Sequence, residues 1–256
     1  MPGSNSDFED TVALVTGSSR GIGAATARLL GERGADVVVN YNSSADAADT
    51  VVDYIRTAEG EGDAIAIQAD VRVRDDVDTM VAETESTFGT VDVLVNNANM
   101  SFPFKPFLEQ SWAEFSAKFQ DELQAAYNCT QATAPAMADQ GYGRIVYVSS
   151  EAARNPQPTF SAHTTAKAGL NGLARAVATE LGGQGIIANV VSPGLVRTEA
   201  SEPYRAEFDD EVRAQTPLGR IAEPEDAARA IAVFASDDAQ FVTGTYTPVN
   251  GGLTVE

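Results

Sequence analysis

The chain has 256 residues, of which 43% are hydrophobic and 21% charged, and its formal net charge is −20. The length suits one α/β domain with a sizeable core, so residues 1–256 are expected to form a single domain behind a loose polar N-terminus, residues 1–9. The acidity argues against nucleic acid or an anionic membrane as a partner. No run is apolar enough for a membrane span and none has the pattern of a signal peptide; together with a lone cysteine, this predicts a cytoplasmic protein.

The basic residues include only three lysines, Lys105, Lys118 and Lys167. Acidic, lysine-poor surfaces are typical of proteins from a high-salt cytoplasm, where dense carboxylates keep the surface hydrated. The alternative is an acidic protein from a GC-rich mesophile in which arginine often replaces lysine. Composition favours the halophile but leaves both sources open.

A glycine-rich turn, Thr16–Gly23, follows the apolar strand expected at Val12–Val15 and precedes the helix expected at Ala24–Leu30. A strand, a glycine turn and a helix are the arrangement that holds a dinucleotide pyrophosphate. Free amides and the dipole at the start of the helix favour the anionic group there. The turn therefore predicts a nucleotide cofactor site.

Strand-like and helical patterns then alternate along the chain, which predicts a Rossmann-type, doubly wound parallel sheet with helices on both faces. Strands are expected at residues 35–40, 63–71, 91–95, 143–150, 185–191 and 241–252. Helices are expected at residues 45–59, 75–88, 111–137, 161 onward and 224–236, and Ser111 with Glu114 has the spacing of a capping box.

The second strand ends without the carboxylate that an NAD-specific site places on the ribose hydroxyls. Its end carries Asn40 and Tyr41, followed by Ser43, and Arg20 in the glycine turn supplies a positive charge. A neutral strand end does not repel a 2′-phosphate. The pattern therefore favours NADP(H) over NAD(H).

The glycine spacing, three residues between Gly17 and Gly21 and one before Gly23, resembles the short-chain dehydrogenase/reductase family. The resemblance continues through an Asp-Val pair, an Asn-Asn-Ala segment, a serine and a lysine seventeen residues apart, and a Pro-Gly loop. It implies no metal, and it implies cofactor contacts from Gly17, Ser19, Arg20, Gly21, Ile22, Gly23, Asn40, Tyr41, Ser43, Asp70, Val71, Asn97, Ala98, Asn99, Lys167, Pro193, Gly194, Val196 and Thr198.

The resemblance also implies a catalytic set of Ser150, His163, Lys167 and Glu122, with two departures from the family pattern. His163 stands where the family has a tyrosine, and Glu122 stands where it has an asparagine that holds a water of the proton relay. A third departure, Asn99, replaces a glycine beside the cofactor. Ser150 is expected to hydrogen-bond a substrate carbonyl and Lys167 to bind the nicotinamide ribose. Like-charge repulsion from Lys167 should lower the pKa of His163.

These features imply an NADP(H)-dependent reductase of a carbonyl, similar to 3-oxoacyl-thioester reductases or ketone reductases. Two alternatives remain: a catalytically impaired or repurposed nucleotide-binding protein, and a non-redox acid/base enzyme that uses His163. Residues 199–218 are expected to form a substrate lid, and the apolar loop 100–107 either lines a pocket or packs ordinarily. The resemblance further implies a homotetramer or homodimer built on the helices at 111–137 and after Lys167.

Overall fold

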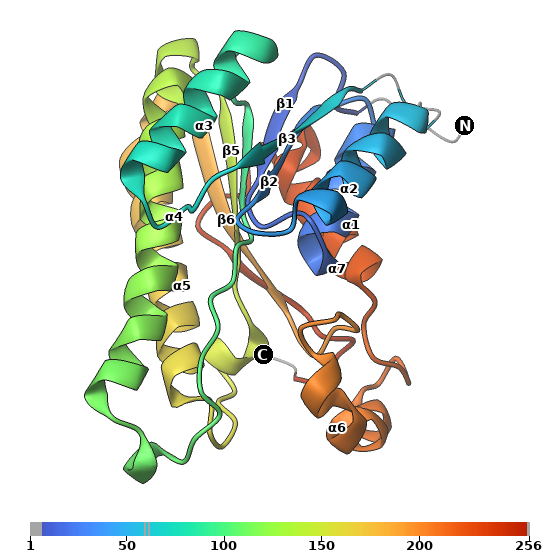
Figure 1. Cartoon of the computed structure of the whole chain (residues 1–256), viewed down its shortest axis with the longest axis vertical. Helices are drawn as coiled ribbons and strands as arrows, with labels where there is room; N and C mark the ends of the chain where they lie inside the picture. Colours follow the sequence, from blue (N-terminus) through green and yellow to red (C-terminus); the bar gives the residue numbers. More distant parts are fainter. Residues whose placement is uncertain (1–6, 59, 61, 255–256) are drawn as a thin grey trace.

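A computed structural model describes residues 7–58, 60 and 62–254. Seven parallel strands form one sheet in the order β3-β2-β1-β4-β5-β6-β7, with helices on both faces (Figure 1). This is the Rossmann-type fold expected from the sequence. The strands are β1 Val12–Val15, β2 Asp36–Tyr41, β3 Ala64–Gln68, β4 Val93–Asn96, β5 Gly143–Val148, β6 Ile186–Pro193 and β7 Tyr246–Val249.

The helices divide between the two faces of the sheet, α1, α2 and α7 on one side and α3, α4 and α5 on the other (Figure 1). Helix α6 lies apart from both layers, below the carboxyl ends of the strands in that view. The bounds are α1 Gly21–Glu32, α2 Ala45–Thr57, α3 Arg74–Thr87, α4 Trp112–Gln140, α5 Ser161–Leu181, α6 Glu202–Gln215 and α7 Pro224–Ala235.

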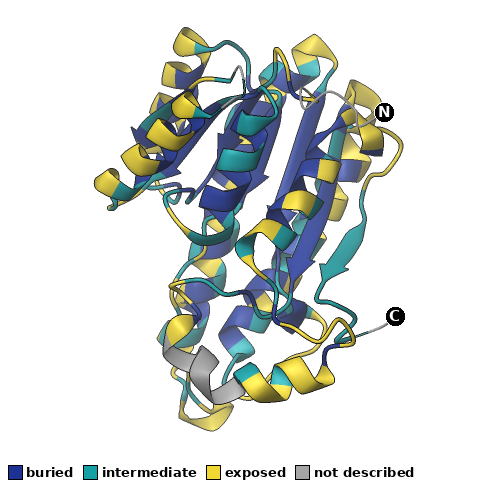
Figure 2. Cartoon of the chain, turned by 90° about the vertical axis from the view of Figure 1, so that its right-hand side faces the viewer, coloured by how far each residue is buried: buried dark blue, intermediate teal, exposed yellow. Residues whose placement is uncertain are grey.

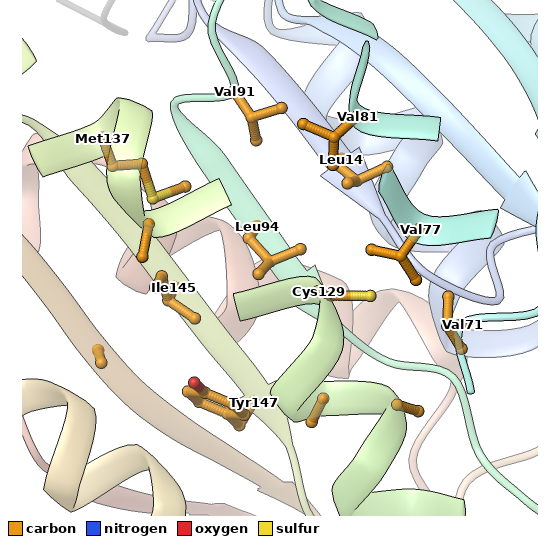
Figure 3. Packing of buried hydrophobic residues seen from close by; sticks show 14 of the residues in the cluster. Leu14, Val71, Val77, Val81, Val91, Leu94, Cys129, Met137, Ile145 and Tyr147 are labelled. Atoms are coloured by element: carbon orange, nitrogen blue, oxygen red, sulfur yellow. The ribbon is translucent and has the colours of Figure 1, made fainter. Parts of the chain in front are cut away.

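Two apolar cores result, because successive side chains of a strand point to opposite faces of the sheet. Leu14 packs with Leu94, Ile145, Cys129 and Met137 under α3 and α4 (Figure 3). The neighbours of Leu14 in β1 pack on the other face, against side chains of α1, α2 and α7. Both faces of the sheet are covered, and the central strands β1, β2, β4, β5 and β6 are accordingly mostly buried, whereas the edge strands β3 and β7 are only partly so (Figure 2).

The site is positioned by a reversal of strand order, because β1 pairs with both β2 and β4. The helices that follow these two strands leave on opposite faces, which opens a crevice at the carboxyl ends of β1 and β4. Long helix α4 begins close to the same end of the sheet. Ser111 and Glu114 cap it as the sequence predicts, and it continues through Pro135 as one helix.

The structure differs from the sequence expectations in several places. Residues 7–9 are not loose, because Phe8 is 1% exposed in the core beside α1 and its amide donates to the Arg33 carbonyl at 3.1 Å. Burial of the Phe8 side chain orders this segment although the residues around it are polar. The third and last strands are shorter than expected, and the segment expected to be a lid contains α6. Positions 1–6 of the N-terminus and position 59 of the second expected helix lie outside the described residues.

Among the described residues, no helix is long and apolar enough to cross a membrane.

Candidate active site

The glycine turn closes tightly against the end of β4. A Cβ atom at Gly23 would lie 2.6 Å from the Gly17 carbonyl oxygen and closer still to the Asn97 amide. A Cβ at Gly17, where φ is +61°, would lie 2.9 Å from the Ala98 Cα. Only glycine fits these positions, so the amides at the start of α1 face the crevice without a side chain in front of them.

Thr16 and Asn97 join β1 to β4 at this point. The Thr16 hydroxyl donates to the Val95 carbonyl at 3.2 Å and accepts from the amides of Asn97 and Ala98 at 2.9 and 3.0 Å. The Asn97 side chain donates to the Thr16 and Gly17 carbonyls at 2.9 and 3.1 Å. The floor of the crevice is therefore fixed by hydrogen bonds before any ligand binds.

Asn40, at the end of β2, is buried and supports the turn. Its side chain accepts from the Gly17 amide at 3.0 Å and donates to the Ala69 carbonyl at 3.2 Å. Beyond β2, Ser43 is exposed, and the Arg20 guanidinium before α1 donates to the Ser44 hydroxyl at 2.6 Å in an exposed position.

A cavity of about 600 Å³ opens beside this pair, between the start of α1 and the chain that follows β6. Ser19, Arg20, Gly21, Ser44 and Thr198 are among its lining residues. Hydroxyls, an arginine and a helix N-terminus are the donors that phosphate groups bind. These groups fit the phosphates of a dinucleotide, although the carboxylates of Glu199, Glu202 and Glu225 also line the cavity.

Other cofactor positions expected from the sequence lie at the carboxyl ends of neighbouring strands. Asp70 and Val71 follow β3, although the Asp70 carboxylate pairs with Arg72 at 2.6 Å. Pro193 ends β6, and Gly194 follows it. Beyond them, Ser201 donates to the Val196 carbonyl at 2.6 Å and accepts from the Thr198 amide at 3.1 Å, which holds this loop in a compact turn.

Helix α5 is fastened to the end of β5 by three hydrogen bonds. The Lys167 ammonium donates to the Val148 carbonyl at 2.9 Å, the Ser149 hydroxyl to the Lys167 carbonyl at 3.2 Å, and the Thr164 hydroxyl to the Ala152 carbonyl at 3.0 Å. Between these residues, the Ser150 hydroxyl accepts from the Ala152 amide at 3.2 Å, which leaves its own proton for another acceptor. His163 and Lys167 lie one turn apart on the buried face of α5.

A buried charge cluster adjoins these residues. One oxygen of the Glu122 carboxylate lies 2.5 Å from the Lys167 ammonium and the other 2.5 Å from the Lys118 ammonium. All three side chains are at least 96% buried. Burial raises the pKa of the Glu122 carboxyl, but the two lysines outweigh it and lower the pKa to about 2. Glu122 is therefore a carboxylate throughout the neutral range.

The imidazole of His163 lies in an aromatic enclosure. The Phe102 ring stacks on it at 4.7 Å between centroids, Phe160 meets it edge-on at 5.9 Å, and its Nδ1 atom is buried without a hydrogen-bond partner. Burial, followed by repulsion from Lys167 and Lys118, lowers the pKa of His163 to about 3. The direction agrees with the sequence analysis, and the ring is neutral at physiological pH.

Comparisons with known proteins match nearly the whole chain. The family described as "Enoyl-(Acyl carrier protein) reductase" matches residues 17–254. The chain is 38% identical to 3-oxoacyl-[acyl-carrier-protein] reductase FabG of Staphylococcus aureus, over 94% of this chain and 97% of that protein. It is 39% identical to a 3-oxoacyl-[acyl-carrier-protein] reductase of Synechocystis sp., over 95% and 97%. The crystal structure of a short-chain type dehydrogenase/reductase from Mycobacterium marinum superposes with a TM-score of 0.90, at 33% identity and 98% coverage of both chains.

The chain belongs to the short-chain dehydrogenase/reductase family. It is an oxidoreductase that acts on C=O or CH–OH groups of small molecules, and its relatives imply a nicotinamide cofactor. No cluster of side chains that could hold a metal ion occurs in the part of the chain that the structure describes.

Sequence reasoning for this short-chain dehydrogenase/reductase missed Lys118. The available signal was its position four residues before Glu122, which places opposite charges on one face of a helix, in a chain with only three lysines. It also missed that Phe102 and Phe160 cover His163. The loop that carries Phe102 is distant in sequence from α5, so no local pattern predicts this contact.

Proposed function

We propose that this protein is an NADP(H)-dependent carbonyl reductase whose catalytic set is Ser150, His163, Lys167 and Glu122. The observation that carries the proposal is the convergence of two features at one edge of the sheet. The glycine turn closes against the end of β4 there, and α5 holds Lys167 against Val148 and Ser149, the residues that precede Ser150. The 3-oxoacyl-[acyl-carrier-protein] reductases among the relatives support a 3-oxoacyl thioester or a ketone as the substrate class.

The preference for NADP(H) rests on the groups beyond β2. Arg20 and Ser44 are already joined by a hydrogen bond at the edge of the cavity, and neither Asn40 nor Tyr41 is acidic. A 2′-phosphate placed there gains a charge-assisted hydrogen bond and meets no carboxylate on β2.

The chemistry assigns one task to each side chain. The cofactor, when bound, would supply the hydride that reduces the carbonyl carbon, and solvent water would supply the proton that the resulting alkoxide takes up, because the ring of His163 is neutral. Ser150 donates its free proton in a hydrogen bond to the substrate oxygen, where negative charge develops. Lys167 would bind the nicotinamide ribose, and the Glu122 carboxylate, 2.5 Å from its ammonium group, balances its charge.

His163 occupies the acid's position but differs from a phenol in one respect. With a pKa of about 3, its ring carries no spare proton near neutrality, so it acts as a hydrogen-bond donor or acceptor. A neutral imidazole is a weak proton source, and we expect modest turnover. This observation also favours the second candidate, an impaired or repurposed nucleotide-binding protein.

The test is a titration with NADPH followed by fluorescence, in high salt, and then turnover on a panel of ketones and acyl thioesters. The proposal expects saturable NADPH binding, tighter than NADH binding, and reduction of at least one carbonyl that weakens in His163→Ala. Binding of NADPH with no reduction of any substrate, unchanged in His163→Ala, would instead identify the repurposed protein. Base-dependent dehydration or isomerisation without NADPH would identify the non-redox enzyme.

We further propose a homotetramer or homodimer in the cytoplasm of a halophile. Trp112 and Tyr127 of α4 are large side chains that remain exposed in the single chain, at 71% and 49%. Tryptophan and tyrosine are enriched in protein interfaces, and we expect a second copy of the chain to cover these two. Light scattering coupled to size exclusion should give two or four copies, and thermal melting in rising KCl should show stabilisation as the −20 charge is screened.

A further inference from the structure

Lys118 is the most constrained ionisable side chain near the site. Its side chain is fully buried, and the ammonium group donates to the Asn99 side-chain oxygen at 2.7 Å, the Met100 carbonyl at 2.5 Å and the Glu122 carboxylate at 2.5 Å. These three acceptors use all three N–H donors of an ammonium group. The same Glu122 oxygen accepts from the Met100 amide at 3.1 Å, so the loop after β4 is fixed from both sides.

The charges around Lys118 come from two helices. On its own helix α4 they are Glu122 and Asp121, and from α5 Lys167 and the neutral ring of His163 face it. Two ammonium groups therefore share the Glu122 carboxylate, which leaves a net charge of +1 in a closed space. Burial, together with repulsion from Lys167, lowers the pKa of Lys118 to about 8 despite the opposing effect of Glu122.

Lys118 also touches the enclosure of His163. Its ammonium nitrogen lies 5.6 Å from the centroid of the Phe102 ring, within the range of a cation–π contact. That ring stacks on the imidazole with an interplanar angle of 20°. Lys118 and His163 thus contact the same aromatic ring, and the charge of Lys118 also acts directly on the imidazole.

We propose that Lys118 is a positioning residue of this site: its ammonium group holds the Glu122 carboxylate against Lys167 and fixes the segment from Asn99 to Phe102 over His163. The importance of Lys118 for turnover rests on the proposed carbonyl reduction. The contacts of its ammonium group do not depend on that proposal. Loss of the Lys118 proton has two consequences. One of the three acceptors loses its donor, and Glu122 then neutralises Lys167 alone, so the net charge falls from +1 to zero.

The sequence offers an unambiguous probe, because His163 is the only histidine. Ring ¹H and ¹⁵N shifts of His163 are recorded in the full-length protein from pH 6 to 10. The wild type should show an inflection near pH 8, far from the pKa of the imidazole itself. Lys118→Met has no titrating group there and Lys118→Arg stays charged, so both should lose the inflection.

Lys105→Met is the matched control, because it makes the same chemical change at a lysine that pairs with Glu114 in a partly exposed position. It should retain the inflection. Glu122→Gln is the second variant if the Lys118 variants fail to fold. Without the carboxylate that supports the ammonium form, its inflection should move to lower pH by about one unit or more.

An inflection that is absent in the wild type, that persists in Lys118→Met, or that does not move in Glu122→Gln overturns the assignment. Turnover gives the second readout. The rate of carbonyl reduction should fall above pH 8 in the wild type, and Lys118→Arg should remove this basic limb. If no carbonyl is reduced, the proposed function fails, while the His163 shifts still decide the role of Lys118.

Discussion

The two halves of the site are built differently. At the glycine turn the backbone is the binding surface, and close contacts with Asn97 and Ala98 leave no room for a side chain at Gly17 or Gly23. In the half around α5, which we propose is catalytic, the charged side chains of Glu122 and Lys118 form one cluster with Lys167. A substitution in the glycine turn is therefore expected to act by steric conflict with the backbone. In the charged cluster, two substitutions that together preserve the net charge are expected to cost less stability than each one alone would suggest.

The largest loss of folding stability should come from removing one charged side chain of the cluster and leaving the other two. Lys118→Met leaves Glu122 paired with Lys167 alone and leaves the Asn99 and Met100 oxygens without a donor, which should cost about 1–3 kcal/mol for each oxygen in the free energy of unfolding. Lys118→Met with Glu122→Gln removes both charges and should cost clearly less than the sum of the single changes. Urea unfolding at fixed salt gives the free energy of unfolding of the wild type, the two single variants and the double variant. If the two losses in the single variants add up to the loss in the double variant, Lys118 and Glu122 act independently.

The ion pairs of Glu122 should also make the free energy of unfolding depend on pH in the acid range. The pKa of Glu122 is about 2 in the folded protein against 4.5 for the ordinary group, so its contribution is fully present above pH 4.5 and is lost as pH falls toward 2. The lowered value corresponds to about 3 kcal/mol. Unfolding free energies of the wild type and Glu122→Gln should therefore converge as pH falls through this window. A difference that does not change with pH would contradict the ionised state of Glu122.

The backbone half should respond to steric change. Gly23→Val places a Cβ against the Asn97 amide and 2.6 Å from the Gly17 carbonyl, which should cost about 1–3 kcal/mol of stability and weaken NADPH binding. Gly172→Ala in α5 is the control, because its Cβ meets nothing within 4 Å. It should be neutral or stabilising. Equal losses of NADPH affinity in both variants would refute the account of the turn.

The smallest effect should be on the choice of cofactor. Arg20→Ala removes the charged partner of Ser44 at the mouth of the cavity, and the preference for NADPH over NADH should fall about tenfold, as expected for one charge-assisted hydrogen bond. Affinities for both cofactors are compared in the same salt. A uniform loss for both would place the 2′-phosphate elsewhere.

The comparison of the two halves also explains what the sequence could predict. The fold followed from alternating apolar strands and helices, and the turn followed from glycine spacing, because both are local patterns. The enclosure of His163 by Phe102 and the burial of Phe8 depend on contacts between distant segments, which local patterns do not contain. Lys118 was visible as a charge four residues before Glu122, but its burial became evident only when α4 was packed against α5.

The central claim, that an imidazole occupies the acid's position in a working carbonyl reductase, is tested most directly by the pH–rate profile of His163→Tyr beside the wild type. A tyrosine next to Lys167 is a stronger proton donor than the neutral ring of His163, whose imidazolium pKa is about 3 and whose remaining N–H is a very weak acid. We predict NADPH-dependent turnover in both proteins, with the rate raised about tenfold or the pH optimum moved upward in His163→Tyr. Identical profiles for the two proteins, or no reduction by either, would contradict the account.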